Sequence, residues 1–431
     1  MNTATIEDIP EVKEEPSIDL TTDQEAALAT FQQFLCNPVE QVMVLSGYSG
    51  CGKSTLVKTI LDQLPNFLKT QLLLDPDTPG YMVALTATTN KAAENFALIT
   101  GHTCGTIHSF LGLRVQTDYN SGKTTLIPRN KNDIKQGYLL FIDEASYVDK
   151  QLLDYIFKMT KDCKIVFIGD PAQLTPVKST DAPVFKAGFL EASLTTVVRQ
   201  AEGNPIIDLS TKFRHTVNTG EFPTNIVLDG HHVKHMNRDD FDQAITDEFT
   251  RPDWRYKDSK FLAWTNKKVV FYNQAIRNLI KGDPHFEEGD YAVCNSYIQI
   301  GNKSIKTDAL VQISSISEDV IHNDVSGNWF NLDGTIAAFM PKTLASKNAR
   351  LKQARASNEY SLIQEIENQW IDLRGAYAQT VNKSQGSTYD RVYIDLDDIS
   401  GCNSGDQIAR MLYVAISRAR HQVFLTGDFG K

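Results

Sequence analysis

Residues 47–54, with the sequence GYSGCGKS, constrain the fold of this chain more than any other segment. They fit the pattern G-x-x-x-x-G-K-[ST], a loop whose glycines let backbone N–H groups converge on phosphate oxygens. The apolar run QVMVLS precedes the loop and STLVKTILDQL follows it, which indicates a strand leading in and a helix leading out. We therefore expect a parallel α/β sheet with a phosphate site at the start of the helix. A glycine-rich turn without a ligand is the alternative.

This loop predicts the binding of ATP and Mg²⁺. Lys53 would place its charge on the β and γ phosphates, and the Ser54 hydroxyl would face the cation. The residues expected to hold the nucleotide are Gly47, Ser49, Gly50, Cys51, Gly52, Lys53, Ser54 and Thr55.

A pair of carboxylates completes the expected ATP site. In YLLFIDEAS, Asp143 and Glu144 follow an apolar run that reads as a neighbouring strand. Asp143 would join Ser54 as a Mg²⁺ ligand, and Glu144 would polarise the attacking water. Taken alone, the pair could be the solvated end of a strand.

The rest of the chain alternates apolar runs with helical patterns. YMVALT and CKIVFIG belong with the first block, while KFLAWT, RVYIDL and HQVFLTG suggest a second α/β block. Between the blocks, residues 285–342 are rich in short strands, and a charged helical stretch of about 30 residues follows them.

Composition narrows the class of protein. The chain has 43 basic and 53 acidic residues, a net charge of −10, and 41% hydrophobic residues, so several buried cores are expected. We expect no membrane span and no secretion signal. The six scattered cysteines fit a reducing compartment, and no metal site is expected at His231, His232 and His235. Net acidity does not exclude a local basic groove.

Further segments resemble the motifs of superfamily 1 helicases, in family order over residues 22–428. VFIGDPAQLTPV resembles motif III, with Asp170 and Gln173, and LTTVVRQAEGNPI resembles motif IV, with Arg199. TVNKSQGSTYDRVYID resembles motif V, including Gly386, and LYVAISRARHQVFL resembles motif VI, with Arg418 as arginine finger. The resemblance implies that Gln24 reads adenine and that Gln173, Arg199 and Arg418 act with Lys53, Asp143 and Glu144 in hydrolysis. Arg199 and Arg418 could each be surface ion-pair residues if seen alone.

The same resemblance implies contacts with single-stranded DNA. TATTNKAA resembles motif Ia and CGTIHSFLG motif Ib, although the family usually has Pro at Thr88 and His at Asn382. Asn90 could instead be a plain helix cap, and Trp264, a candidate for base stacking, could lie in a core. The residues expected to contact DNA are Thr89, Asn90, Lys91, Thr106, His108, Phe110, Thr265, Asn266, Thr380, Lys383 and Ser384.

LRVQTDYNSGKTTLIPRN consists of two alternating runs around Asn120-Ser121-Gly122, which predicts a hairpin. The family places its strand-separating pin at this point, so the hairpin is expected to be the wedge. A surface hairpin without a role is the alternative.

Together these signals predict an α/β protein with two RecA-like parallel-sheet lobes and an inserted SH3-like β domain. The expected division is an acidic disordered lead-in at 1–18, lobe 1A at 19–195 with its hairpin 1B at about 111–131, lobe 2A at 196–284 and 373–431, and domain 2B with a long helix at 285–372.

The motifs are closest to the RecD-like and phage Dda-like branch, superfamily 1B. This implies an ATP-dependent DNA helicase that moves 5′ to 3′ and acts in replication, repair or recombination. The expected partners are single-stranded DNA, duplex junctions, and single-strand-binding or replication proteins, but no membrane. We expect a monomer in the cytoplasm of a bacterial or phage-infected cell. The alternative is a P-loop ATPase that remodels RNA or protein without unwinding DNA, and a nucleotide-binding structural module is a third reading.

Overall fold

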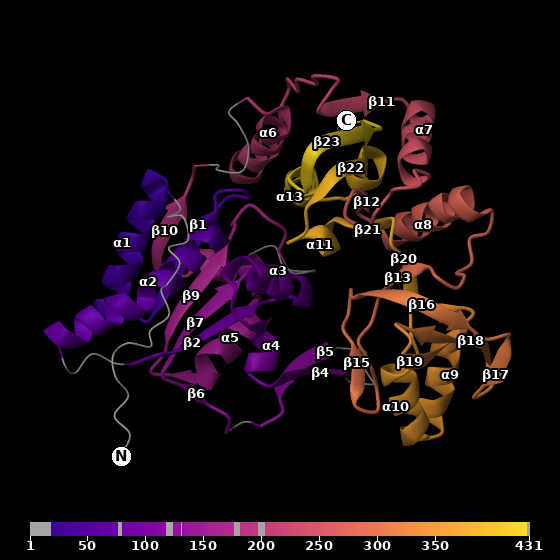
Figure 1. The fold of residues 1–431 in the computed structure, drawn as a ribbon, viewed down its shortest axis with the longest axis horizontal. Coiled ribbons are helices and arrows are strands. Elements are labelled where there is room, and N and C mark those ends of the chain that lie inside the picture. Colours follow the sequence, from indigo (N-terminus) through magenta and orange to yellow (C-terminus); the bar gives the residue numbers. More distant parts are fainter. Residues whose placement is uncertain are drawn as a thin grey trace, which may run out of the picture.

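The computed structural model describes residues 19–75, 80–117, 124–130, 132–175, 182–196 and 203–428. Two lobes, each built on a parallel sheet with helices on both faces, lie next to each other, and a β-rich domain is inserted into the second lobe (Figure 1). The predicted α/β class with two parallel-sheet lobes is confirmed. Among the described residues, no helix combines the length and apolar character needed to cross a membrane.

Lobe 1 contains a sheet of six parallel strands. Their order is β10 (Leu190–Leu194), β1 (Val42–Gly47), β9 (Lys164–Gly169), β7 (Tyr138–Asp143), β2 (Met82–Ala87) and β3 (Cys104–Thr106). Strand β9 thus lies between β1 and β7. The strand that ends at Asp143, β7, is therefore not the direct neighbour of β1, the strand before the glycine-rich loop. The loops after all three strands leave the same edge of the sheet, where ligands of open parallel sheets bind.

Two layers of helices bury the faces of this sheet. Side chains alternate along the strands, so Met43 and Leu45 face one layer while Val44 faces the other. The helices are α1 (Thr22–Cys36), α2 (Lys53–Leu74) and α3 (Asn90–Thr100) on the first face, and α4 (Ile107–Phe110), α5 (Lys150–Met159) and the short η1 (Ala145–Tyr147) and η2 (Pro183–Lys186) on the second.

Lobe 2 repeats this architecture with five parallel strands. Their order is β11 (Val233–Met236), β23 (Ala419–Thr426), β22 (Tyr389–Asp395), β12 (Ser259–Ala263) and β21 (Ala378–Thr380). The helices are α6 (Pro205–Thr219), α11 (Val381–Ser384), α12 (Leu396–Ser400) and α13 (Gly405–Ile416), with α7 (Arg238–Phe249) and α8 (Asn266–Lys281) on the other face.

The inserted domain is an antiparallel sheet packed against two helices (Figure 1). Its strands are β13 (Tyr291–Cys294), β14 (Ile298–Ile300), β15 (Lys303–Ile305), β16 (Leu310–Ile316), β17 (Val320–His322), β18 (Val325–Leu332), β19 (Ile336–Pro341) and β20 (Leu373–Gly375). Because β20 pairs with β13, the sheet continues beyond the predicted boundary at residue 372.

The prediction of one long helix in the inserted domain is wrong. The stretch forms two helices, α9 (Leu344–Ala356) and α10 (Tyr360–Asn368). Asn358 lies between them with φ of 56°, the left-handed conformation that ends a helix. The two helices fold back on the sheet, where Ile366 and Trp370 bury against Phe339.

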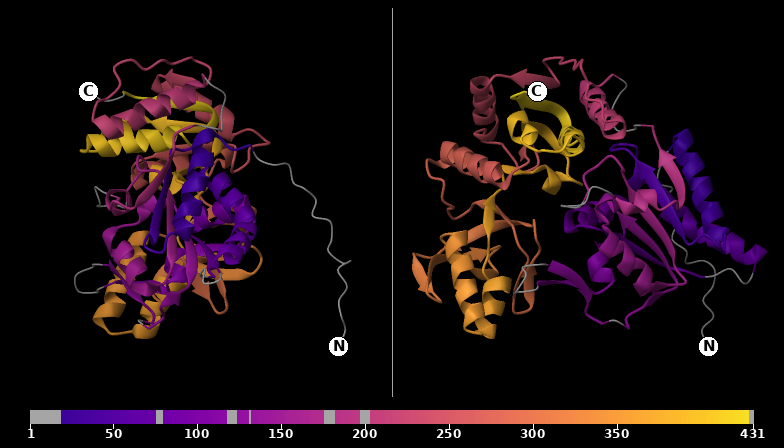
Figure 2. Two further views of the ribbon diagram at one scale, coloured as in Figure 1. Left: turned by 90° about the vertical axis from the view of Figure 1, so that its left-hand side faces the viewer. Right: turned by 180° about the vertical axis from the view of Figure 1, so that it is seen from behind.

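The predicted hairpin is present as β4 (Leu113–Thr117) paired antiparallel with β5 (Thr124–Pro128). Its turn, Asn120-Ser121-Gly122, lies outside the described residues, as do the lead-in at 1–18 and Arg199. The hairpin projects from lobe 1 on the side of the inserted domain, as both the front and the rear views show (Figures 1 and 2). Two short strands of lobe 1, β6 (Lys135–Gln136) and β8 (Thr160–Lys161), pair with each other in parallel.

Candidate ATP cleft and strand groove

The glycine-rich loop joins β1 to α2 as the sequence predicted. Gly52 has φ of 74° and turns the chain directly into α2, which leaves the N–H groups of the first turn free to face the cleft. Gly47 passes so close to β10 that an added Cβ would lie 2.9 Å from the Leu194 Cβ, so no larger residue fits. The Lys53 ammonium donates to the carbonyls of Gly47 at 2.7 Å and Tyr48 at 2.9 Å.

Gln24 braces this loop from α1. Its side chain is buried, accepts the Thr21 N–H at 3.0 Å and donates to the Cys51 carbonyl at 3.0 Å. The amide oxygen therefore helps to cap α1, while the amide nitrogen fixes the loop. Gln24, Gly47 and the buried Cys51 do not line the cleft that the other expected nucleotide residues share.

Asp143 and Glu144 stand together at the end of β7. Glu144 has φ of 53° and caps η1, which bends the chain so that both side chains reach the cleft. Burial raises the pKa of Asp143, and burial together with the adjacent Asp143 charge raises the pKa of Glu144 to about 7. Thr88, where the family usually has proline, donates its hydroxyl to the Glu144 carbonyl at 3.1 Å and supports the pair.

These residues suit a magnesium ion. Ser54 and Asp143 supply the hydroxyl and carboxylate oxygens that Mg²⁺ prefers, on the wall of the cleft that holds Lys53. A divalent cation would also balance the negative charge that these two adjacent, half-buried carboxylates concentrate there.

Lobe 2 closes the cleft with Arg418. The side chain is buried and donates to the Ser49 hydroxyl of lobe 1 at 3.3 Å, while its other nitrogens bond to the carbonyls of Val414 at 3.1 Å and Ser387 at 3.3 Å. The guanidinium is thus fixed by its own lobe and presented to the opposite one. This is the geometry expected of an arginine finger.

A second bridge between the lobes runs through Gln173 and Gln385. Gln385 donates to the Gln173 side chain at 2.8 Å, and the Tyr147 hydroxyl of lobe 1 donates to Gln385 and, at 3.0 Å, to the Asn382 carbonyl. Motif III of one lobe is therefore bonded directly to motif V of the other.

The cleft between the lobes measures about 420 Å³. It gathers the following predicted residues: Ser49, Gly50, Gly52, Lys53, Ser54, Thr55, Asp143, Glu144, Gln173, Gly386 and Arg418. Sequence reasoning missed Tyr413, which contacts the loop from α13 and lies five positions before Arg418 in motif VI.

The predicted DNA residues share one local design. Thr89, Thr106, Thr265 and Thr380 each lie at or within two residues of the end of a strand and cap the helix that follows, with the hydroxyl accepting a backbone N–H of the first turn. Two of these capped turns belong to each lobe, so the strand-threonine-helix unit occurs on both sides of the groove. Asn90 is the first residue of α3 rather than its cap.

Beneath these turns lies a small pocket of about 40 Å³ between the lobes and the inserted domain. Lys91, Asn266, Thr380 and Lys383 line it. The Lys383 ammonium reaches Asn295 and Asp308 of the inserted domain, both at 2.6 Å, so motif V is anchored to that domain.

Three predicted DNA contacts are placed otherwise. Ser384 is fully buried and donates its hydroxyl to the Val381 carbonyl at 2.7 Å. Phe110 packs edge-on against Tyr138 with ring centroids 5.2 Å apart, on the core beneath the sheet. His108, expected among the DNA contacts, is half-buried, and burial lowers its pKa.

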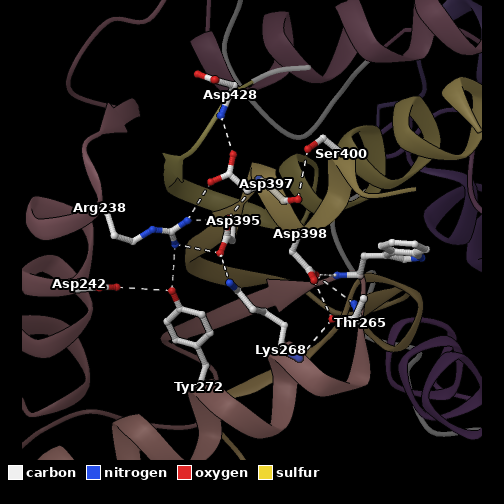
Figure 3. A network of polar contacts seen from close by, with 11 residues as sticks. Arg238, Asp242, Thr265, Lys268, Tyr272, Asp395, Asp397, Asp398, Ser400 and Asp428 are labelled. Carbon is white, nitrogen blue, oxygen red and sulfur yellow. Dashed lines mark hydrogen bonds and ion pairs between the residues drawn. The ribbon is translucent and has the colours of Figure 1, made fainter. Parts of the chain in front are cut away.

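Figure 3 shows what holds the Thr265 turn in place. The Asp398 carboxylate accepts the backbone N–H groups of Trp264 at 2.6 Å and Thr265 at 3.1 Å, and the Thr265 hydroxyl at 2.7 Å. The Trp264 ring is half-buried and packs on the core of lobe 2, the alternative that the sequence left open.

The same network has a buried centre. Asp395 is fully buried and pairs with Arg238 at 2.9 Å and Lys268 at 2.8 Å (Figure 3). Although burial opposes it, these hydrogen bonds lower the pKa of Asp395 below its usual range. The start of α8 is therefore rigidly tied to the end of β22.

The histidines near β11 form a turn rather than a group converging with His235. Asp229 accepts the backbone N–H groups of His231, His232 and Val233 and pairs with the His232 ring at 2.7 Å. Asp229, His231 and His232 each have one potential ligand atom within 4.8 Å of the other two. The sequence pattern did not indicate that the Asp229 carboxylate would lie beside these histidines.

Comparison with known families agrees with this architecture. The family described as AAA domain matches residues 19–227, and the family described as UvrD-like helicase C-terminal domain matches residues 375–426. The two matched domains coincide with the two lobes and agree with the resemblance to superfamily 1 helicases that the motifs carry.

Two relatives are named as ATP-dependent DNA helicases. The ATP-dependent RecD2 DNA helicase of Deinococcus radiodurans is 25% identical over 408 residues, which cover 90% of this chain and 47% of the relative. The ATP-dependent DNA helicase Pif1 of Bdellovibrio bacteriovorus is 24% identical over 439 residues, covering 94% of this chain and 86% of the relative. The chain thus spans less than half of RecD2 but most of the Pif1 relative.

A solved structure has the same fold. It is a Pif1 helicase described in DNA unwinding at forked duplex DNA, with a TM-score of 0.54 and 18% identity, and the match covers 96% of this chain and 93% of that one.

Proposed function

We propose that the chain is an ATP-dependent DNA helicase that moves along single-stranded DNA, from 5′ to 3′. The observation that carries the proposal is the contact of Arg418 with Ser49, because it makes the ATP cleft a joint between two lobes. The relatives RecD2 and Pif1 are named as ATP-dependent DNA helicases, which supports the same activity here. The direction rests on the resemblance to the RecD-like and Dda-like branch.

Hydrolysis follows from the cleft residues. Ser54 and Asp143 would hold Mg²⁺, which neutralises charge on the phosphate oxygens when bound. Glu144 accepts the proton of the attacking water, a role suited to a carboxylate whose pKa is raised to about 7. Lys53 and Arg418 stabilise the charge that spreads over the transferred phosphoryl group.

Movement along the strand follows from DNA contacts on both lobes. ATP draws Arg418 toward the loop and closes the lobes, and hydrolysis releases them. Each lobe carries threonine-capped turns whose N–H groups suit phosphates of a strand. The hydrogen bond between Gln173 and Gln385 transmits closure of the lobes to motif V. The distance between the capped turns of the two lobes therefore changes with each ATP that is bound and hydrolysed.

The hairpin β4–β5 is proposed as the wedge that turns this movement into strand separation. It belongs to lobe 1 and lies outside the ATP cleft. Such a motor would act in the cytoplasm on single strands and duplex junctions, with single-strand-binding or replication proteins as the fitting partners.

The test is strand displacement on duplexes that carry a single-stranded tail. With ATP and Mg²⁺, the protein should separate a duplex with a 5′ tail and leave one with a 3′ tail intact. Separation of the 3′-tailed duplex alone would reverse the proposed direction. ATP hydrolysis that RNA or protein stimulates, without separation of either duplex, would favour the remodelling ATPase instead.

A further inference from the structure

Tyr413 connects α13 of lobe 2 to the ATP site of lobe 1. Its side chain is 2% exposed, and its hydroxyl donates to Asp170 at 2.5 Å and accepts the backbone N–H of Ser49 at 3.0 Å. Asp170 is itself fully buried, and its second oxygen accepts the Ala172 N–H at 2.9 Å. One phenol oxygen therefore joins the glycine-rich loop to motif III from the opposite lobe.

The partner of Tyr413 on the loop is also the partner of the finger. Arg418 donates to the Ser49 hydroxyl at 3.3 Å and to the Val414 carbonyl, next to Tyr413 in the chain, at 3.1 Å. Ser49 shares the cleft wall with Lys53 and Glu144. The Ser49 N–H thus lies on the side of the loop that faces the finger, where the γ-phosphate is transferred.

This N–H has an acceptor already, and so does the lysine of the loop. Tyr413 takes the Ser49 N–H, and Lys53 donates to the carbonyls of Gly47 and Tyr48. Glycine-rich loops bind phosphates through such donors, so a phosphate has to replace these internal acceptors. ADP and ATP differ only in the γ-phosphate, and the Tyr413 oxygen is the acceptor that lobe 2 supplies to Ser49, the loop residue to which Arg418 also bonds.

We propose that Tyr413 limits the preference for ATP over ADP: its hydroxyl holds the Ser49 N–H when ADP is bound and gives it up to the γ-phosphate of ATP. The hydroxyl keeps its bond to Asp170 in both states. Burial, followed by the Asp170 charge, raises the pKa of Tyr413 well above its ordinary value, so the phenol stays a proton donor to that carboxylate. The inference rests on the proposed function only for the binding of ATP.

The substitution Tyr413→Phe is expected to affect the ADP complex and the ATP complex differently. Without the hydroxyl, the half-buried Ser49 N–H loses its protein acceptor in the ADP complex, whereas the γ-phosphate supplies one in the ATP complex. The loss of one neutral hydrogen bond corresponds to about fivefold in affinity, so the ratio of the ADP to the ATP dissociation constant should rise by about fivefold. The loss of the Asp170 bond is common to both states and cancels in the ratio.

The measurement is calorimetric titration of ADP and ATP into Glu144→Gln protein with and without Tyr413→Phe, in the presence of Mg²⁺. Should Glu144→Gln still hydrolyse ATP, the imido analogue of ATP replaces it. A matched control is Tyr393→Phe, which removes another buried hydroxyl of lobe 2, bonded to the Ala244 carbonyl at 3.3 Å and away from the loop. The control should leave the ratio unchanged.

A ratio that stays within twofold in Tyr413→Phe, or that falls, would overturn the proposal. Thermal unfolding checks that the variant is folded. If it is not, deuterium exchange of the Ser49 amide in the Glu144→Gln protein decides, since protection is expected with both ADP and ATP. Unprotected exchange with ADP would contradict the role of Tyr413. None of these titrations uses DNA, so their failure is distinct from a failure of strand displacement.

Discussion

The candidate ATP cleft and the proposed strand groove lie between the same two lobes, but they are built differently. In the cleft, side chains of lobe 2 form hydrogen bonds with side chains of lobe 1, as Arg418 does with Ser49 and Gln385 with Gln173. In the groove, each lobe has its own threonine-capped turns, and the hydroxyls are used within the lobe. The cleft is therefore suited to sense closure, and the groove to grip with backbone groups.

The largest expected effect tests the cleft. Lys53→Ala removes the cation of the loop that reaches the β and γ phosphates, so ATP hydrolysis should fall by about a thousandfold or more. Lys58→Ala is the matched control, because Lys58 lies on the same helix and pairs with Asp62 at 3.8 Å. Steady-state ATPase assays compare the two. Hydrolysis within a few-fold of the wild type in folded Lys53→Ala protein would show that the loop is not the ATP site.

Arg418→Lys tests whether the cleft depends on contact between the lobes. Lysine keeps the charge but lacks the planar guanidinium whose nitrogens donate to Ser49, Val414 and Ser387 at the same time. We therefore expect kcat to fall by at least about a hundredfold with little change in KM for ATP. Arginine fingers act mainly on transition-state charge, which is why kcat carries the effect. A rise in KM at unchanged kcat would assign Arg418 to substrate binding.

Replacing Val115–Ile127 with a short Gly-Ser turn tests the division of labour on the groove side. The hairpin lies outside the cleft, so DNA-stimulated ATPase and movement on single strands should persist while unwinding falls by about tenfold or more. Opening a base-pair step costs about 1.4 kcal/mol in stacking, so thermal fraying leaves a residual rate. Wild-type unwinding by a variant that translocates normally would place the wedge elsewhere, most naturally in the inserted β domain.

The smallest effect concerns the capped turns. Thr89→Val and Thr265→Val each remove a cap from a helix start in one lobe, so affinity for single-stranded DNA should fall about three- to tenfold, measured by fluorescence anisotropy. Thr343→Val is the control, since Thr343 caps α9 in the inserted domain in the same way. All three variants should lose about 1 kcal/mol of unfolding free energy. Equal DNA affinities in the three would mean that the turns do not grip the strand.

Much of the cleft was predictable because its motifs are contiguous. The glycine-rich loop and the carboxylate pair each occupy a few neighbouring residues, and the strands before them are continuous apolar runs. The bridges between lobes were not predictable from such patterns, because Tyr413 meets a loop residue 364 positions away and Gln385 meets one 212 positions away. Only the fold brings these partners together.

In two places the local sequence pattern led to a prediction that differs from the structure. The stretch after residue 342 reads as one helix because its residues favour helix, but Asn358 adopts the left-handed conformation and tertiary packing folds the two halves together. Ser384 sits in a motif that suggests DNA contact, yet its side chain is buried and bonded to the Val381 carbonyl. Both differences arise from packing that no short pattern records.

The most direct test of a cleft coupled to a strand groove is the rate of ATP hydrolysis by the unaltered protein with and without single-stranded DNA. Binding of a strand across both lobes should favour the closed cleft, so kcat should rise by about tenfold or more at saturating DNA. The apparent DNA affinity should weaken as salt increases, because phosphate contacts release counterions. Hydrolysis that is unchanged by single-stranded DNA at low salt would contradict the coupling.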